Sequence, residues 1–303
     1  MKPTHPLHGL VAATHTPFHA DGSLNLSVVE RQAQFLTENG VTSFFIGGST
    51  GESSSLSLDE RLALAQRWCE VTRGTAARVI VHVGSNCIVD SRALAAQAQE
   101  VGAVAISALA PSYFKPRSLD LLIGCCAEIA AAAPETPFYF YDIPALTGVS
   151  LPMLEFLEKA PARIPTLAGL KFTNPDLMAY LQCLRAGDWD IPWGLDEWML
   201  GALATGARGA VGSSFNFAAP LYHGLIAAFE HGDLAAARDA QHRSTQLIAL
   251  LARHGYMGAA KATMAMLGVD VGPARLPNGS LTAAQAKTLR TELETLGFFD
   301  WLK

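Results

Sequence analysis

Short apolar runs alternate with longer amphipathic segments along the first two-thirds of the chain. The short runs are rich in Val, Ile, Phe or Tyr and end in Gly, Pro, Ser or Asn, which is typical of parallel strands buried on both faces. The predicted strands are Leu10–Pro17, Val41–Gly47, Arg78–Gly84, Ala103–Leu109, Pro137–Ile143, Leu167–Phe172, Ile191–Leu195 and Gly209–Ser213. Eight strands alternating with helices predict an α/β fold of the (β/α)8 TIM-barrel type, with an open doubly wound sheet as the alternative.

Helical patterns fill the segments between these runs. Leu26–Asn39 is followed by Gly40, and Ser57–Arg73 is followed by Gly74, so both end as helices commonly do. In the second helix, Ser57 precedes Glu60 by three residues, which predicts a capping box at its start.

The chain after about Pro220 contains helical patterns and no further strand. These patterns are Leu221–His231, Leu234–His254 and Thr282–Leu296. No linker-like composition separates them from the rest. We therefore expect one domain over residues 1–303, with the barrel core at 9–220 and a C-terminal helical appendage at 221–303 packed on the barrel.

Composition and charge exclude several classes of partner. Half of the residues are hydrophobic and 16% are charged, which suits a compact enzyme, and the net charge is −5. The sequence has no basic run, so we expect no nucleic-acid partner. It also lacks an apolar stretch of about 18 residues, so we expect no membrane-spanning helix. With no apolar signal segment and five cysteines lacking CxxC spacing, we expect a cytoplasmic protein with reduced thiols.

One lysine stands out chemically. The chain has seven lysines, and Lys171 alone lies inside an apolar strand, in the sequence LAGLKFT. Burial disfavours an ammonium and so favours the neutral amine that Schiff-base chemistry needs. The alternative from position alone is a strand-end lysine that reaches water or pairs with a carboxylate.

Other candidate residues follow the ends of predicted strands, where barrel enzymes place their active sites. Ser49 and Thr50, in the glycine-rich GGSTGE segment, could hold an anion, or the segment could be a tight turn without ligand. Tyr141 could instead be a buried core tyrosine, and Asp196-Glu197 could be a helix cap. No spacing of His, Cys and carboxylate residues suits a metal, so we predict no metal site.

Five motifs occur in an order and spacing that resemble the N-acetylneuraminate lyase and dihydrodipicolinate synthase superfamily of class I aldolases. They are GGSTGE (Gly47–Glu52), YDIPALTG (Tyr141–Gly148), GLKFT (Gly169–Thr173), GLDE (Gly194–Glu197) and GAVGSS (Gly209–Ser214). The resemblance runs from about Gly9 to the C-terminus.

Within the superfamily the chain is more similar to the lyase branch. Leu146 stands where the synthases usually have an arginine for a second substrate carboxylate, and Thr173 stands in the Phe-Thr pair that follows the lysine in animal-type lyases. Asp142 departs from the lyases, which usually have Asn or His there. A related enzyme for another 2-keto-3-deoxy acid therefore stays open, as does a dihydrodipicolinate synthase.

The resemblance implies catalytic roles for Lys171, as the Schiff-base nucleophile, and for Tyr141, as a proton relay. It implies that the remaining site residues bind substrate: Ser49, Thr50, Thr173, Gly194, Asp196, Glu197 and Ser213. The implied partners are pyruvate and a small 2-keto sugar acid, N-acetylneuraminate, cleaved reversibly to pyruvate and N-acetylmannosamine without cofactor. A homotetramer is also implied, with Tyr113 near a subunit contact. A non-enzymatic sugar-acid sensor would need neither Lys171 nor Tyr141.

Overall fold

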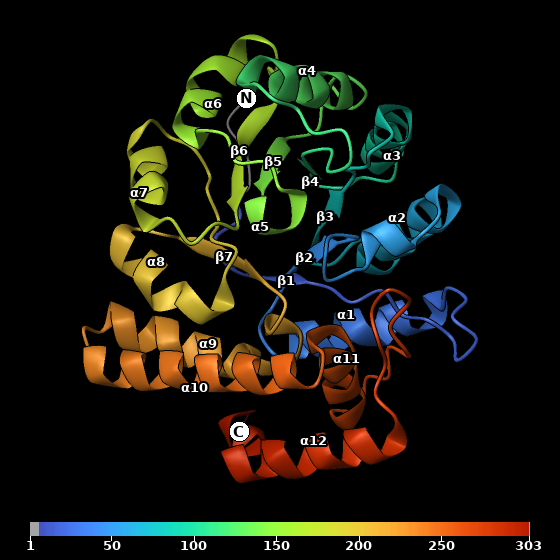
Figure 1. Ribbon diagram of the computed structural model, residues 1–303, viewed down its shortest axis with the longest axis vertical. Helices are drawn as coiled ribbons and strands as arrows, with labels where there is room; N and C mark the ends of the chain where they lie inside the picture. Colours follow the sequence, from blue (N-terminus) through green and yellow to red (C-terminus); the bar gives the residue numbers. More distant parts are fainter. Residues whose placement is uncertain (1–5, 303) are drawn as a thin grey trace.

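A curled parallel sheet forms the centre of the molecule (Figure 1), and the computed structural model describes residues 6–302. The neighbouring strands follow the order β6-β5-β4-β3-β2-β1-β7, and every pair is parallel. The strands are β1 (Gly9–Ala13), β2 (Ser43–Ile46), β3 (Arg78–His82), β4 (Ala105–Leu109), β5 (Phe138–Asp142), β6 (Leu167–Phe172) and β7 (Gly209–Gly212).

An extended segment closes the sheet between β6 and β7. Asp190 bridges to Gly169 of β6, and Trp193 bridges to Ala210 of β7, both in parallel orientation. The predicted strand Ile191–Leu195 therefore occupies the eighth position, although it forms isolated bridges and no regular strand. Pro192 contributes to this because it has no N–H to donate to a ladder. The predicted barrel is confirmed, and an open doubly wound sheet is excluded.

Close approach at this closure requires a glycine on β6. A Cβ added to Gly169 would lie 1.7 Å from the Asp190 carbonyl oxygen, which leaves no room for a side chain. The packing against Asp190 therefore explains why residue 169 of the GLKFT motif is a glycine.

Alternate residues of the strands build two separate cores. On β2, Phe44 belongs to the layer between sheet and helices, whereas Phe45 belongs to a smaller core inside the barrel. At the amino end of the barrel, the Tyr139 hydroxyl and the Leu7 N–H both donate to Asp190 Oδ2 at 2.6 Å. These hydrogen bonds tie β5 and the segment before β1 to the closing segment at this end of the barrel.

Helices surround the strands in the expected alternation. They are α1 (Val29–Glu38), α2 (Leu58–Thr72), α3 (Ile88–Glu100), α4 (Leu119–Ala130), α5 (Pro144–Thr147), α6 (Met153–Lys159), α7 (Leu177–Arg185) and α8 (Met199–Thr205). The predicted capping box of α2 is confirmed, because Glu60 N donates to Ser57 Oγ and Ser57 N donates to the Glu60 carboxylate.

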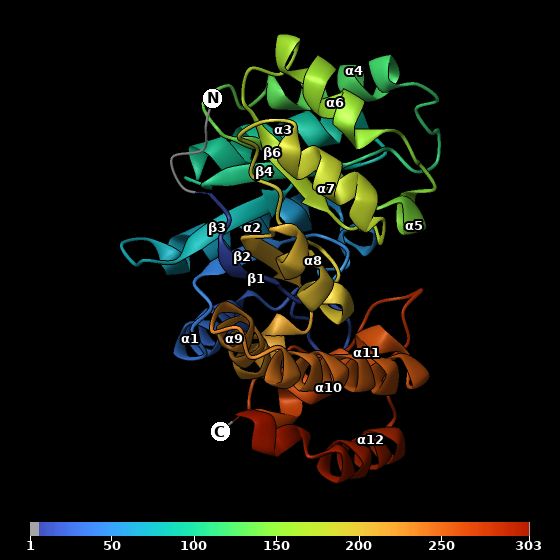
Figure 2. The same cartoon turned by 90° about the vertical axis from the view of Figure 1, so that its left-hand side faces the viewer.

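The C-terminal helices stack along one side of the barrel, with α12 outermost (Figures 1 and 2). They are α9 (Phe215–Glu230), α10 (Leu234–Arg253), α11 (Tyr256–Met266) and α12 (Ala283–Leu296). Helix α9 begins at Phe215, earlier than predicted, and continues through a kink at Ala218 with Pro220 inside it. It therefore spans residue 220, and the division of the chain there stays a prediction.

Helix α11 was not predicted from the sequence. Its small residues are buried on several sides, so its pattern lacks the single apolar stripe by which a surface helix is recognised. Across residues 6–302, none of the helices has the length and apolar character required to cross a membrane.

Candidate active site

A cavity of about 270 Å³ opens at the carboxyl ends of the strands and contains the Lys171 side chain. Eight of the nine residues predicted for the site line it: Ser49, Thr50, Tyr141, Lys171, Gly194, Asp196, Glu197 and Ser213. They come from segments spread over most of the barrel, so only the closed sheet brings them together.

A bulge in β6 directs Lys171 into the barrel. Phe138 pairs with Leu167 and Tyr139 pairs with Gly169, so Ala168 is an extra residue in β6. Because side chains alternate along a strand, the extra residue reverses which side the following residues face. Lys171 is consequently paired with Tyr141, and both face the barrel interior.

Burial favours the neutral amine form of Lys171 over the ammonium. Its Nζ lies 3.9 Å from the ring centroids of Phe45 and Tyr141, and the residue is 4% exposed. Desolvation lowers the pKa of the Lys171 ammonium from 10.5 to about 7, although the charge of Asp196 opposes this shift. A substantial fraction of Lys171 is therefore a free amine at neutral pH, which is the form that attacks a ketone.

Tyr141 lies against this amine as a neutral phenol. Burial raises the pKa of the Tyr141 hydroxyl to about 12, while the hydroxyls of Ser49 and Thr173 oppose the shift. Its oxygen lies 3.4 Å from Ser49 Oγ. The phenol can therefore pass a proton between a substrate hydroxyl and a neighbouring group without being ionised beforehand.

The loop after β2 presents Ser49 and Thr50 to the cavity. Both are partly exposed, between Gly47 in the left-handed region (φ 64°) and Gly51. The Gly47 carbonyl oxygen lies 2.9 Å from His82 Nδ1, and the Gly51 carbonyl accepts from Thr16 Oγ1 at 2.6 Å. Hydroxyls on a loop fixed at both ends can hold a carboxylate.

Asp196 is buried in a 3₁₀ turn (Asp196–Trp198) on the opposite wall. Its Oδ2 accepts from the Ser214 N–H at 2.8 Å and from the Ser214 hydroxyl at 2.5 Å. Burial nevertheless raises the pKa of the Asp196 carboxyl to about 6. The group remains mostly ionised at neutral pH and can accept hydrogen bonds from hydroxyls.

Thr173 lies behind the cavity wall rather than on it. A Cβ at Gly194 would lie 1.9 Å from Thr173 Oγ1, so Gly194 covers this side chain and must lack one of its own. Thr173 is thereby placed beside the Tyr141 phenol.

Tyr256 lines the cavity and was missed by sequence reasoning. It is the first residue of α11, and its hydroxyl lies 2.7 Å from Ser213 Oγ. Burial raises the pKa of this phenol above its usual range. Because α11 itself was not predicted, no local pattern pointed to Tyr256.

Two histidines are buried without forming a metal site. Burial lowers the pKa of His15 to about 3 and that of His82 well below its usual range, with Lys261 and Arg61 respectively adding to the shift. Within residues 6–302, no three His, Cys, Asp or Glu residues are grouped to hold a metal ion.

Comparison with known proteins identifies the family. The model of the dihydrodipicolinate synthetase family matches residues 6–296. The chain belongs to this family. It is 40% identical to the N-acetylneuraminate lyase of Gallus gallus over 283 residues, covering 91% of this chain and 92% of the relative.

Solved structures of both branches share the fold. The N-acetylneuraminate lyase of Proteus mirabilis superposes with a TM-score of 0.94 at 39% identity, covering 97% of this chain and all of that one. The DHDPS (dihydrodipicolinate synthase) of Cyanidioschyzon merolae gives a TM-score of 0.89 at 29% identity, with 97% and 99% covered. These similarities confirm the predicted superfamily and its class of carbon–carbon lyases.

Asp142 and Leu146, the two positions that bear on the choice between lyase and synthase, lie away from the cavity. Asp142 follows Tyr141 on β5 and therefore faces outward, where Asn174 Nδ2 donates to its carboxylate at 3.3 Å. Burial raises the pKa of Asp142 to about 6. Leu146, on α5, is 66% exposed and does not line the cavity. The departure at Asp142 therefore does not alter the cavity wall, and Leu146 does not form an apolar pocket there.

Proposed function

We propose that this chain is an N-acetylneuraminate lyase, which cleaves its substrate reversibly to pyruvate and N-acetylmannosamine. The observation that carries this proposal is the buried Lys171, with its pKa lowered to about 7, beside Tyr141 in the barrel cavity. Its support is the 40% identity to lyases over most of the chain.

The first step is imine formation. The Lys171 amine attacks the C2 ketone of the open-chain sugar acid, and the resulting carbinolamine loses water to give a protonated imine. Ser49 and Thr50 would hold the C1 carboxylate beside Lys171, so that the ketone carbon faces the amine.

Carbon–carbon cleavage follows from the electron-withdrawing imine. Tyr141 relays the proton from the C4 hydroxyl as the C3–C4 bond breaks, and the bonding electrons move into the imine to give an enamine. C4 becomes the aldehyde of N-acetylmannosamine. Protonation of the enamine at C3, followed by hydrolysis, releases pyruvate and regenerates the Lys171 amine.

The opposite wall suits the polyhydroxylated part of the substrate. Asp196 and Glu197 offer carboxylate acceptors, and Ser213 with Tyr256 offers a pair of hydroxyls 2.7 Å apart. Carboxylates accept strongly from sugar hydroxyls and repel a second carboxylate at short range. This arrangement favours a sugar acid over the short acidic aldehyde that a dihydrodipicolinate synthase would use.

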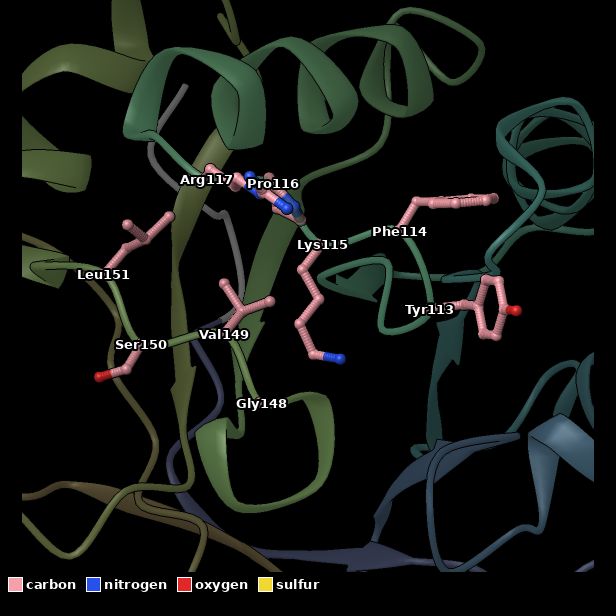
Figure 3. A pocket seen from close by; sticks show the side chains of 9 residues that line it. All are labelled: Tyr113, Phe114, Lys115, Pro116, Arg117, Gly148, Val149, Ser150 and Leu151. Atoms are coloured by element: carbon pink, nitrogen blue, oxygen red, sulfur yellow. The ribbon is translucent and has the colours of Figure 1, made fainter.

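We also propose a homotetramer in the cytoplasm. Tyr113 and Phe114 are 78% and 86% exposed, and their rings pack edge-on beside a second cavity that Lys115 and Gly148 also line (Figure 3). Exposed aromatic pairs of this kind are typical of subunit contacts. Buried free thiols at Cys69, Cys126 and Cys183 suit a reducing compartment.

The decisive experiment measures pyruvate release from a panel of 2-keto-3-deoxy acids, with N-acetylneuraminate included. We expect N-acetylneuraminate to give the highest kcat/KM. A higher value for another acid would reassign the substrate, and faster condensation of pyruvate with aspartate semialdehyde would assign a synthase. Binding of the sugar acid without pyruvate release would indicate a sensor.

A further inference from the structure

A buried ion pair lies behind the loop that carries Ser49 and Thr50. Glu52 Oε1 is 2.7 Å from Lys261 Nζ, and the two side chains are 0% and 2% exposed. Lys261 Nζ also donates to the carbonyl oxygens of Thr16 at 2.9 Å and Pro273 at 2.8 Å. Because buried charges persist only with well-placed partners, these contacts hold Lys261 in one position.

The other carboxylate oxygen of Glu52 is also bound. It accepts from Arg275 N at 2.8 Å and from Asn278 Nδ2 at 3.3 Å. Among residues 6–302, Glu52 is the one non-glycine residue with positive φ, at 54°. Such a backbone conformation is unfavourable for a long side chain and persists where its surroundings impose it. The anchored carboxylate therefore maintains the backbone at the end of the loop.

Two hydrogen bonds connect this ion pair to the loop that carries the proposed carboxylate-binding residues. Glu52 N donates to the Ser49 carbonyl at 3.1 Å. Thr16, whose carbonyl accepts from Lys261, donates through its own hydroxyl to the Gly51 carbonyl at 2.6 Å. Lys261 thus supports the loop by two routes, through Glu52 and through Thr16.

We propose that Glu52 and Lys261 are positioning residues, which orient Ser49 and Thr50 toward the carboxylate of the keto acid. The inference rests on the proposed function. Lys261 is on α11, and so is Tyr256, which contacts Ser213 on the sugar side of the cavity. The hydrogen bonds traced from the ion pair lead to the loop that carries Ser49 and Thr50. Loss of the pair affects recognition of pyruvate and leaves recognition of the aldehyde unchanged.

The test measures both substrates separately in the condensation direction. Glu52→Gln and Lys261→Met should raise KM for pyruvate by about 10- to 100-fold, the usual effect of a small misplacement in an active site. KM for N-acetylmannosamine, measured at saturating pyruvate, should not change. The pyruvate concentration for half-maximal borohydride trapping at Lys171 should rise with KM. Lys261→Arg, which keeps the charge, should recover part of the loss.

An unchanged KM for pyruvate, or an equal rise for both substrates, would overturn the proposal. Leu289→Ala is the matched control, because Leu289 is fully buried on α12 and away from the loop. It should lower stability and the active fraction without changing either KM.

A milder variant covers the case in which the ion-pair variants fail to fold. Thr16→Val removes only the hydroxyl that reaches Gly51, and it should raise KM for pyruvate selectively. An unchanged value in this variant would contradict the inference. Absence of trapping at Lys171 in wild type would instead contradict the proposed function, so the two failures are distinguishable.

Discussion

At the residue scale, burial sets the protonation state of one amine. Lys171 lies against the rings of Phe45 and Tyr141, and desolvation there lowers its pKa to about 7. The same burial raises the pKa of the Tyr141 phenol to about 12. Removal from water therefore acts on both groups, and it is the amine whose protonation state at neutral pH changes.

The pH dependence of imine formation tests the state of Lys171. Below about pH 7 the amine is mostly protonated, so the rate of borohydride trapping at subsaturating pyruvate should rise about tenfold per pH unit and level off above pH 7. The measurement is trapping rate against pH. A rate that continues to rise toward pH 10 would show that Lys171 has the pKa of an ordinary lysine.

Tyr141→Phe separates the two chemical steps. Phenylalanine keeps the ring that packs on Lys171 but removes the hydroxyl that we propose relays the C4 proton. We expect imine formation with pyruvate to continue while the cleavage rate falls by about 10²- to 10⁴-fold. Single-turnover cleavage and pyruvate trapping measure the two steps. Near-normal turnover would remove Tyr141 from the mechanism.

At the scale of elements, irregularities in the backbone aim the side chains. The bulge at Ala168 turns Lys171 into the barrel, and the 3₁₀ turn at Asp196–Trp198 places the Asp196 carboxylate against Ser214. A regular strand and a regular loop would direct these groups elsewhere.

Asp196→Asn tests this arrangement. Loss of one charged hydrogen bond to a sugar hydroxyl should lower kcat/KM for N-acetylneuraminate by about 10- to 150-fold, while pyruvate trapping is retained. Because the carboxylate stabilises the Lys171 ammonium, its removal should also move the midpoint of the trapping profile to lower pH. Ser214→Ala keeps the carboxylate but removes a hydrogen bond that lowers the pKa of Asp196, so it should move the midpoint in the same direction by less. Equal loss of cleavage and trapping in Asp196→Asn would indicate a structural role.

At the scale of the whole molecule, burial of Lys171 lowers stability. The pKa of Lys171 is lower in the folded than in the unfolded chain, so the unfolded state binds more protons between about pH 7 and 10.5. The loss of stability caused by Lys171 has its full size below pH 7 and disappears as the pH rises through this range.

Lys171→Met should therefore be more stable than wild type. The gain in the free energy of unfolding should be on the order of a few kcal/mol at pH 6, and it should be smaller at pH 9. Denaturant unfolding of both proteins at the two pH values measures the difference, and Lys287→Met on the surface of α12 is the control. A gain that does not depend on pH would contradict the shifted pKa.

The sequence by itself determined the alternation of strands and helices, the capping box of α2 and the position of Lys171 within a strand. These features depend on local patterns, because strand burial, helix capping and an apolar setting for Lys171 are visible within a few residues. The ordered motifs also predicted eight of the residues that line the cavity.

Only the tertiary structure decided which side chains meet. The bulge in β6 arises from pairing with β5 and reverses the side that Lys171 faces, so strand alternation alone could not place it. Tyr256 reaches the cavity through a helix that lacks an apolar stripe, and Glu52 meets Lys261 across more than half of the chain. Such contacts depend on closure of the barrel and on the path of the C-terminal segment, which no local spacing of residues encodes.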